Sequence, residues 1–178
     1  MSWIPEKRVE YSWLDSVLLK LLRCGEIPRH VAFIMDGNRR FARERNIERI
    51  EGHTQGFDKL AETLQWCNDV GVKEVTVYAF SIENFKRKED EVNGLLDLAR
   101  SKFRRLLEER ERLREHGIRV RVIGNVGLLP EDLRDLIARA EAATKDNADK
   151  TLNVAFSYTA REEITNVRTN FHSIENQI

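Results

Sequence analysis

The chain has 178 residues, of which 30 are basic and 30 are acidic, so its formal net charge is zero. This length suits one domain with its own core, and 41% hydrophobic with 34% charged residues is typical of a folded globular protein, not of a disordered chain. A zero net charge excludes a general electrostatic attraction for nucleic acid, so any anion site must be local.

Cysteine content and hydropathy exclude two further classes. The two cysteines, Cys24 and Cys67, are too few for a disulfide framework and lack metal-site spacing, so we expect reduced thiols in a cytosolic setting. The apolar run at 17–24 is short and is interrupted by Lys20 and Arg23, so we expect no transmembrane span, and the acidic N-terminal residues argue against a signal peptide.

The first predicted element is an amphipathic helix over 11–22, because apolar residues recur there at helical spacing. Its apolar face has two interpretations. It packs on the domain's own core, or it contacts a membrane surface or a lipidic ligand. We predict residues 1–25 as an N-terminal helical segment and 26–178 as a single domain.

Beyond this helix, strand-like and helical patterns alternate. Such alternation predicts an α/β fold in which helices flank a central parallel sheet. The final residues, from 167 to 178, lose periodicity and are predicted to be a frayed end. The predicted strands are 30–35, 74–80, 119–124 and 152–158, and the predicted helices are 38–46, 54–69, 89–116 and 131–145.

The sequence DGNRR, residues 36–40, follows the first predicted strand. In a parallel sheet, ligands bind where the carboxyl ends of the strands meet loops and helix N-termini. Gly37 allows close backbone approach, Asn38 is a candidate cap for the next helix, and Arg39 and Arg40 carry forked donors that match phosphate oxygens. These residues predict an anion site.

Asp36 is the unexpected member of this group, because a carboxylate repels a bound phosphate. A cation between the two removes the conflict, and Mg²⁺ commonly takes one or two carboxylates together with phosphate oxygens and water. Asp36 is therefore a candidate Mg²⁺ ligand. The alternative is that Asp36 simply pairs with an arginine.

Two further clusters add polar candidates. In EGHTQG, residues 51–56, glycines flank His53 before a predicted helix with Thr54 as its cap, which makes a second anion contact by Arg49 and His53 credible. Ser81, Asn84 and Arg87 follow the second strand at spacings of three, so one turn can direct all three to the same site. A turn-and-cap role for Ser81 and Asn84 is the alternative.

The sequence contains no GxGxxG, Walker A, GxSxG or HExxH pattern. Instead, three stretches in order, HVAFIMDGNRRFA, EGHTQG and VTVYAFSIENFKR, resemble the undecaprenyl diphosphate synthase-like, or cis-prenyltransferase, family, in particular its eukaryotic dolichol-forming members. That family condenses an allylic prenyl diphosphate, such as farnesyl diphosphate, with isopentenyl diphosphate. The resemblance implies prenyl chain elongation that makes long-chain cis-polyprenyl diphosphate, the dolichol precursor for protein glycosylation.

The resemblance also implies roles for individual residues. Asp36 would hold Mg²⁺, and Asp36 and Asn84 would assist condensation and proton loss. Glu91 opens the long helix whose apolar side would wall a product tunnel. The residues implied to bind substrate are Gly37, Asn38, Arg39, Arg40, Arg49, His53, Phe80, Ser81, Phe85, Arg87 and Glu91. The implied partner is a related Nogo-B-receptor-like subunit, and the implied location is the cytoplasmic face of the endoplasmic reticulum membrane.

The chain departs from the family pattern after REEITN, where no counterpart of the late isopentenyl diphosphate motif, similar to RTSGExRLSxFLLWQ, follows. We therefore expect a C-terminally truncated chain that is weak or inactive alone. One rival interpretation is a non-catalytic interaction subunit or truncated isoform of a prenyltransferase complex, and another is a Mg²⁺-dependent phosphoesterase. Nucleic-acid binding is disfavoured, because no aromatic stacking platform accompanies the arginines.

Overall fold

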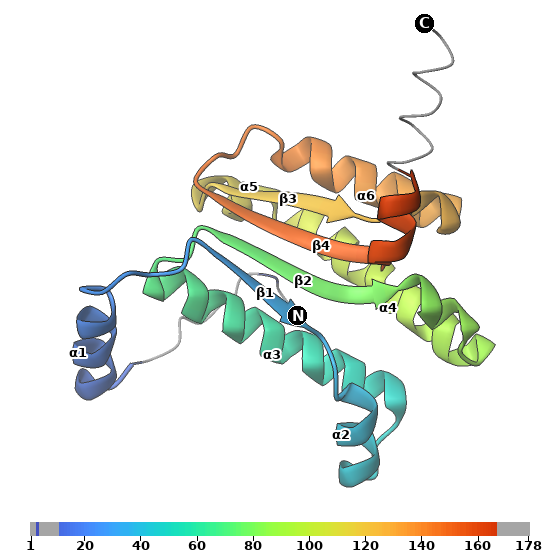
Figure 1. The fold of residues 1–178 in the computed structure, drawn as a ribbon, viewed down its shortest axis with the longest axis horizontal. Coiled ribbons are helices and arrows are strands. Elements are labelled where there is room, and N and C mark those ends of the chain that lie inside the picture. The colour runs from blue at the N-terminus through green and yellow to red at the C-terminus, as the bar shows by residue number, and fades with distance from the viewer. Residues whose placement is uncertain (1–2, 4–10, 167–178) are drawn as a thin grey trace, which may run out of the picture.

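The structure is a computed structural model that describes residue 3 and residues 11–166. Its four strands form one parallel sheet in the order β1-β2-β4-β3 (Figure 1), which confirms the predicted α/β class. The prediction for residues 167–178, and part of that for 1–25, fall outside the described residues. The strands are β1 (His30–Ile34), β2 (Glu74–Ser81), β3 (Ile118–Ile123) and β4 (Lys150–Tyr158).

Helices connect the strands, and the core lies between them and one face of the sheet. Val75, Val77 and Phe80 of β2 are buried on that face, where they pack in one cluster with side chains of α3, α4 and α6. The helices are α1 (Trp13–Leu22), α2 (Asn38–Arg45), α3 (Arg49–Val70), α4 (Glu89–Glu108), α5 (Arg110–Glu115) and α6 (Glu131–Thr144), with short 3-10 helices η1 (Ile82–Lys86) and η2 (Val126–Leu128).

The parallel register brings the carboxyl ends of the strands to one edge. Ile34 of β1 pairs with Tyr78 of β2, and Tyr78 pairs with Ala155 of β4. The pairing continues past β1, because the Met35 N–H donates to the Tyr78 carbonyl at 3.2 Å. The segments that follow β1 and β2, which carry the predicted site residues, therefore start side by side.

The long helix predicted over 89–116 is interrupted at Glu109, which lies between α4 and α5 with non-helical backbone angles. The Glu109 carboxylate is buried, where it accepts the backbone N–H of Trp3 at 3.2 Å and the Arg105 Nε–H at 2.7 Å. The interruption thus coincides with a contact to residue 3, which no local pattern could show.

Helix α1 does not pack its apolar face on the core, contrary to the first interpretation of its sequence. In the described chain none of its ten residues is buried, and Trp13, with 79% of its surface exposed, and Leu21, with 68%, face solvent. Tyr11 holds the helix to α3 through a hydrogen bond to Asp69 at 2.7 Å. Burial and, to a smaller extent, that bond raise the pKa of Tyr11 to about 12. Among the described residues, no helix is long and apolar enough to cross a membrane.

Candidate functional site

The turn between β1 and α2 is set by Gly37, which has a left-handed φ of +92° and is the N-cap of α2. Only glycine adopts such a φ without strain. Asp36 accepts the Gly37 N–H at 2.6 Å and pairs with Arg40 at 3.0 Å. Asn38 is not a cap, as had been predicted, but the first residue of the helix. The N–H groups in the first turn of α2 have no acceptor within the helix, so they point back toward the turn that carries Asp36.

The EGHTQG stretch lies inside α3 and not in a loop before a helix, so the predicted cap role of Thr54 is wrong. Its hydroxyl donates to the Ile50 carbonyl one turn earlier. The glycines serve packing against α2: a Cβ at Gly52 would lie 2.6 Å from the Asn38 carbonyl oxygen, and one at Gly56 would lie 2.3 Å from Asn38 Oδ1. Small residues one turn apart thus let α2 approach α3 and bring Asn38 beside His53.

His53 is the residue that α3 presents to the site. Its pKa is lowered by burial and by the nearby Arg87 and Arg39, so the ring is neutral at pH 7. The Asn38 side-chain nitrogen lies 3.3 Å from Nδ1, a contact that suits the tautomer in which Nδ1 accepts and Nε2 carries the ring proton. Nε2 is buried and has no hydrogen-bond partner among the described residues, so it is a polar atom available to a ligand.

Glu91 ties the starts of α3 and α4 together. Its carboxylate, 8% exposed, accepts from Arg49 and from Arg87, each at 3.0 Å. Burial alone would raise the pKa of Glu91, but the Arg49 hydrogen bond and the charges of Arg87 and Arg39 outweigh it and hold the pKa below its ordinary value. Glu91 is therefore ionised at neutral pH and positions two arginines.

Ser81 and Asn84 form a capping box around η1, in agreement with the alternative interpretation of this pair. The Ser81 hydroxyl accepts the Glu83 N–H at 3.1 Å, and the Asn84 side-chain oxygen accepts the Ser81 N–H at 2.9 Å. Phe85 packs edge-on against Phe80, with ring centroids 5.0 Å apart. This compact turn fixes the direction in which Arg87, one residue past η1, leaves the sheet edge.

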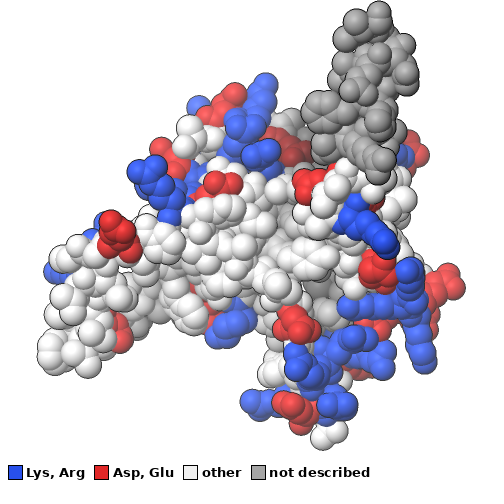
Figure 2. All heavy atoms as spheres, in the orientation of Figure 1, with Lys and Arg blue, Asp and Glu red and all other residues white. Residues whose placement is uncertain are grey.

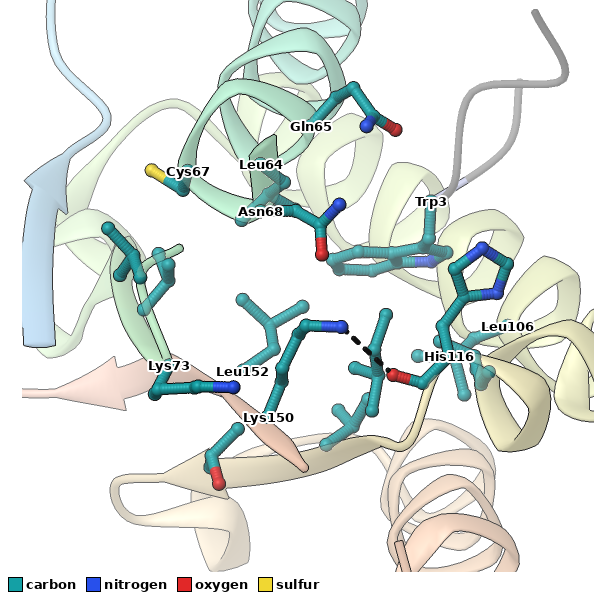
Figure 3. A pocket seen from close by; sticks show the side chains of 16 residues that line it. Trp3, Leu64, Gln65, Cys67, Asn68, Lys73, Leu106, His116, Lys150 and Leu152 are labelled. Carbon is teal, nitrogen blue, oxygen red and sulfur yellow. Dashed lines mark hydrogen bonds between the residues drawn. The ribbon is translucent and has the colours of Figure 1, made fainter. Parts of the chain in front are cut away.

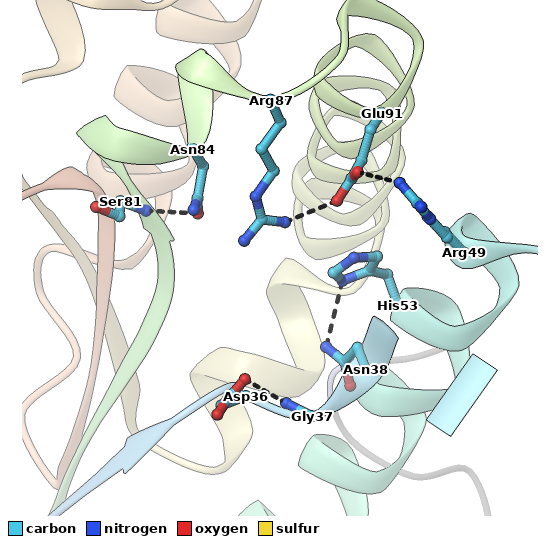
Figure 4. A network of polar contacts seen from close by, with 9 residues as sticks. All are labelled: Asp36, Gly37, Asn38, Arg49, His53, Ser81, Asn84, Arg87 and Glu91. Atoms are coloured by element: carbon cyan, nitrogen blue, oxygen red, sulfur yellow. Dashed lines mark hydrogen bonds and ion pairs between the residues drawn. The ribbon is translucent and has the colours of Figure 1, made fainter. Parts of the chain in front are cut away.

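Most of the predicted residues meet in one polar cavity at the carboxyl edge, which we call the cradle (Figure 4). Arg49 and Glu91 line an adjoining cavity on the other side of His53. Figure 2 shows Lys and Arg side chains gathered over α2 and the start of α4, whereas α1 is mostly uncharged. The residues that line the cradle are Met35, Asp36, Gly37, Asn38, Arg39, Arg40, His53 and Arg87.

An apolar pocket opens beside the cradle, between α3, α4 and the sheet. Asn38 and His53 line both cavities and so mark the boundary between polar and apolar surface. The α4 side of this pocket agrees with the apolar side predicted for the long helix. Phe57 and Leu60 of α3 were not predicted, although their helical spacing from His53 was the available signal. Its apolar lining residues include Phe57, Leu60, Val77, Phe80, Leu95, Leu98, Phe103 and Phe156.

The residues of the cradle suit Mg²⁺ only when a bound phosphate ligand supplies further oxygen atoms to the ion. The described residues contain no group of three or more His, Cys, Asp or Glu side chains that could hold a metal ion. Asp36 offers an exposed carboxylate, and Mg²⁺ readily combines one carboxylate with phosphate oxygens and water. The cradle therefore suits a metal ion that arrives with a phosphate ligand, and the Asp36–Arg40 pair is the contact it would replace.

Comparison with known proteins identifies the class of this fold and site. The family profile "Putative undecaprenyl diphosphate synthase" matches residues 34–177, and the chain belongs to that prenyltransferase family. The family uses a divalent metal ion. The chain is 57% identical over 166 residues to the dehydrodolichyl diphosphate synthase complex subunit DHDDS of Homo sapiens, a match that covers 93% of this chain and 49% of the human one.

The chain is also similar to diphosphate synthases from an archaeon and a plant. The tritrans,polycis-undecaprenyl-diphosphate synthase (geranylgeranyl-diphosphate specific) of Archaeoglobus fulgidus is 49% identical over 150 residues, covering 84% of this chain and 59% of that protein. Lavandulyl diphosphate synthase from Lavandula x intermedia, solved with dimethylallyl diphosphate, superposes with a TM-score of 0.77 at 30% identity, covering 85% of this chain and 64% of that one. The chain spans about half the length of the human relative.

Proposed function

We propose that this chain binds an allylic prenyl diphosphate, with the diphosphate in the cradle and the prenyl chain in the apolar pocket beside it. The observation that carries the proposal is the shared wall: Asn38 and His53 line both cavities, so a ligand with a charged head and an apolar tail can occupy both. A ligand with only one of these parts would leave half of the site unfilled.

Each cradle residue has a defined task in this proposal. The N–H groups at the start of α2 and the guanidinium groups of Arg39 and Arg87 bind phosphate oxygens. The neutral His53 donates its Nε2 proton, without adding a charge, to an oxygen at the boundary of the two cavities. Glu91 does not touch the anion, which it would repel, but holds Arg87 at the entrance.

Asp36 is the proposed Mg²⁺ ligand. A bound Mg²⁺ would neutralise charge on the diphosphate and stabilise the leaving pyrophosphate as the allylic C–O bond breaks. Asp36 then faces a cation instead of a bare phosphate, which explains a carboxylate among arginines. Asn84, whose side-chain oxygen is held by Ser81, would direct its NH₂ group toward the reacting end, together with Phe80 and Phe85.

For the whole protein, we propose elongation of the allylic substrate with isopentenyl diphosphate to a long-chain cis-polyprenyl diphosphate, a dolichol precursor. The human relative, 57% identical, is a subunit of the dehydrodolichyl diphosphate synthase complex, and this supports the assignment. A related, Nogo-B-receptor-like partner subunit and association with the cytoplasmic face of the endoplasmic reticulum membrane belong to the same proposal. The 178-residue chain alone is proposed to be weak or inactive.

The proposed binding is tested by calorimetry with farnesyl diphosphate, inorganic pyrophosphate and farnesol, each with and without Mg²⁺. We expect farnesyl diphosphate to bind most tightly and to need Mg²⁺, because only this ligand fills both cavities. Equal affinity for pyrophosphate and farnesyl diphosphate would show that the apolar pocket plays no part.

A second assay addresses catalysis. Radiolabelled isopentenyl diphosphate with farnesyl diphosphate and Mg²⁺ should give little or no polyprenyl product from this chain alone. Robust product would refute the proposed inactivity. Phosphate release from simple phosphate esters would favour the phosphoesterase alternative instead.

A further inference from the structure

A charged side chain lies in the apolar pocket beside the cradle, and the proposed function gives it no task. Lys102 of α4 lines that pocket, and only 7% of its surface is exposed. The other described residues that line the pocket are uncharged, because the His53 ring is neutral. A buried charge is unfavourable without a partner, so an ammonium in a pocket suited to hydrocarbon calls for a function.

The ammonium of Lys102 is held by an aromatic ring. Its Nζ lies 3.9 Å from the centroid of the Phe57 ring, within the range of a cation–π contact. The charge of Asp58 acts to raise the pKa of Lys102, but burial outweighs it and lowers the pKa. Among the described residues, no carboxylate forms an ion pair with Lys102, so the Phe57 ring is its direct partner there.

The backbone at Lys102 is fixed on both sides. Its carbonyl accepts the indole N–H of Trp3 at 2.7 Å, and the next residue, Phe103, is 2% exposed in the core. Helix α4 therefore cannot rotate to carry Lys102 out of the pocket. Only the side chain can move when the pocket is filled.

Lys102 lies farther from the cradle than the other α4 residues that line the apolar pocket, Phe103 excepted. Both α3 and α4 begin at the carboxyl edge, where Arg49 pairs with Glu91. Lys102 is three turns past Glu91, about 16 Å along the helix axis, and Leu95 comes between them. A chain that starts at the cradle therefore meets Leu95 first and the Lys102 ammonium farther in.

A second apolar pocket of the described chain has a different set of lysines. It lies at the amino edge of the sheet, where β2, β3 and β4 begin, and is lined by Lys73 and Lys150 (Figure 3). Lys102 does not line it. The ammonium of Lys102 therefore belongs to the pocket that opens from the cradle.

We propose that Lys102 is a specificity-determining residue, whose ammonium over the Phe57 ring limits the length of the allylic chain that the pocket accepts. A short chain ends before the ammonium and leaves its contact with the ring intact. A longer chain must displace the ammonium or lie against it, and both weaken binding. This inference rests on the proposed function, since it assumes that the pocket holds the prenyl chain.

The test compares geranyl, farnesyl and geranylgeranyl diphosphate, which differ by one isoprene unit each. Calorimetry with Mg²⁺ measures their binding to the unmodified chain and to Lys102→Met, which keeps an unbranched side chain but removes the charge. The variant should bind geranylgeranyl diphosphate about tenfold more tightly, farnesyl diphosphate less so, and geranyl diphosphate as before. No gain for the longest chain, or the same gain for all three, would overturn the inference.

Two further variants separate the ammonium from other effects. Lys102→Arg keeps a cation that stacks on a ring, so it should keep the length preference of the unmodified chain. Arg104→Met is the matched control, because it removes an exposed cation of the same helix, and it should leave all three affinities unchanged. A gain for geranylgeranyl diphosphate in Arg104→Met equal to that in Lys102→Met would refute the role of Lys102.

Failure of this inference is distinguishable from failure of the proposed function. If the cradle does not take the diphosphate, none of the three diphosphates will bind to any variant. Farnesol and geranylgeraniol need only the apolar pocket, so Lys102→Met should still favour geranylgeraniol about tenfold more than the unmodified chain does. An unchanged preference between the two alcohols would overturn the assignment of Lys102 by itself.

Discussion

Both edges of the sheet carry basic side chains beside apolar surface, but the two edges arrange these side chains differently. At the carboxyl edge, a tight turn at Gly37 and the α2–α3 contact hold arginines, Asp36 and His53 in one network around a polar cavity. At the amino edge, Lys73 and Lys150 stand at an apolar pocket without such a network. Preorganised donors suit a diphosphate with a defined geometry, whereas the amino edge offers mainly apolar surface.

The largest expected effect comes from breaking the scaffold of the carboxyl edge. Gly52→Ala would place a Cβ 2.6 Å from the Asn38 backbone carbonyl, which cannot move without shifting α2. We expect a loss of about 2–4 kcal/mol in the free energy of unfolding, measured by urea denaturation.

Gly94→Ala is the matched control, because it is also a helical glycine but its Cβ would meet only the flexible Ile50 side chain at 3.3 Å. It should change the free energy of unfolding by less than about 1 kcal/mol. Equal losses in the two variants would contradict the role assigned to Gly52.

The next effect concerns ligand binding and not stability. Asp36→Asn should weaken farnesyl diphosphate binding about 10- to 100-fold in Mg²⁺ and much less in its absence, because the amide no longer pairs with the cation. Calorimetry in both conditions measures the difference. Asp97→Asn, at an exposed position on α4, is the control, and a Mg²⁺-independent loss in Asp36→Asn would argue against a metal role.

Glu91 links stability to pH. Its folded-state pKa is lowered, so its ion pairs stabilise the fold above its ordinary pKa of 4.5, and this contribution is lost as the pH falls through the lowered value. Glu91→Gln should cost about 1 kcal/mol at pH 7, and the difference from the unmodified chain should shrink below pH 4.5. Urea denaturation across pH measures this, and a difference that grows on acidification would contradict it.

The smallest effect on stability is expected at α1. Leu18→Gln with Leu21→Gln changes two exposed side chains, 48% and 68% accessible, so the free energy of unfolding should change by less than about 0.5 kcal/mol. Binding to phosphatidylcholine vesicles should nevertheless fall. A large loss of stability would mean that α1 packs on the domain after all.

The sequence predicted each strand to within two residues, because the apolar and β-branched runs are read directly from local composition. It misplaced EGHTQG, since glycines that usually mark a loop serve here to let α2 approach α3. It also missed the interruption at Glu109, where a buried carboxylate meets Trp3, more than a hundred residues away in the chain. Contacts of that kind depend on the assembled fold, which local patterns do not contain.

The candidate site likewise combines residues that local patterns predict with contacts that depend on the assembled fold. Motif residues such as Asp36, Asn38 and Arg87 were predicted together because they follow neighbouring parallel strands. Arg49 and Glu91, which were also predicted as substrate contacts, pair with each other beside the cradle, a contact that their separation in the chain does not indicate. The lysines of the amino edge belong to no motif, because Lys73 and Lys150 are brought together only by the pairing of β2 with β4.

Binding of the allylic diphosphate at the carboxyl edge of the sheet is tested most directly by a map of NMR chemical-shift changes on addition of farnesyl diphosphate and Mg²⁺. The account predicts changes at the backbone amides of 36–40 and at the methyl groups of Leu95 and Leu98, with little change near Lys73 and Lys150. Changes confined to the amino edge, with residues 36–40 unaffected, would contradict it.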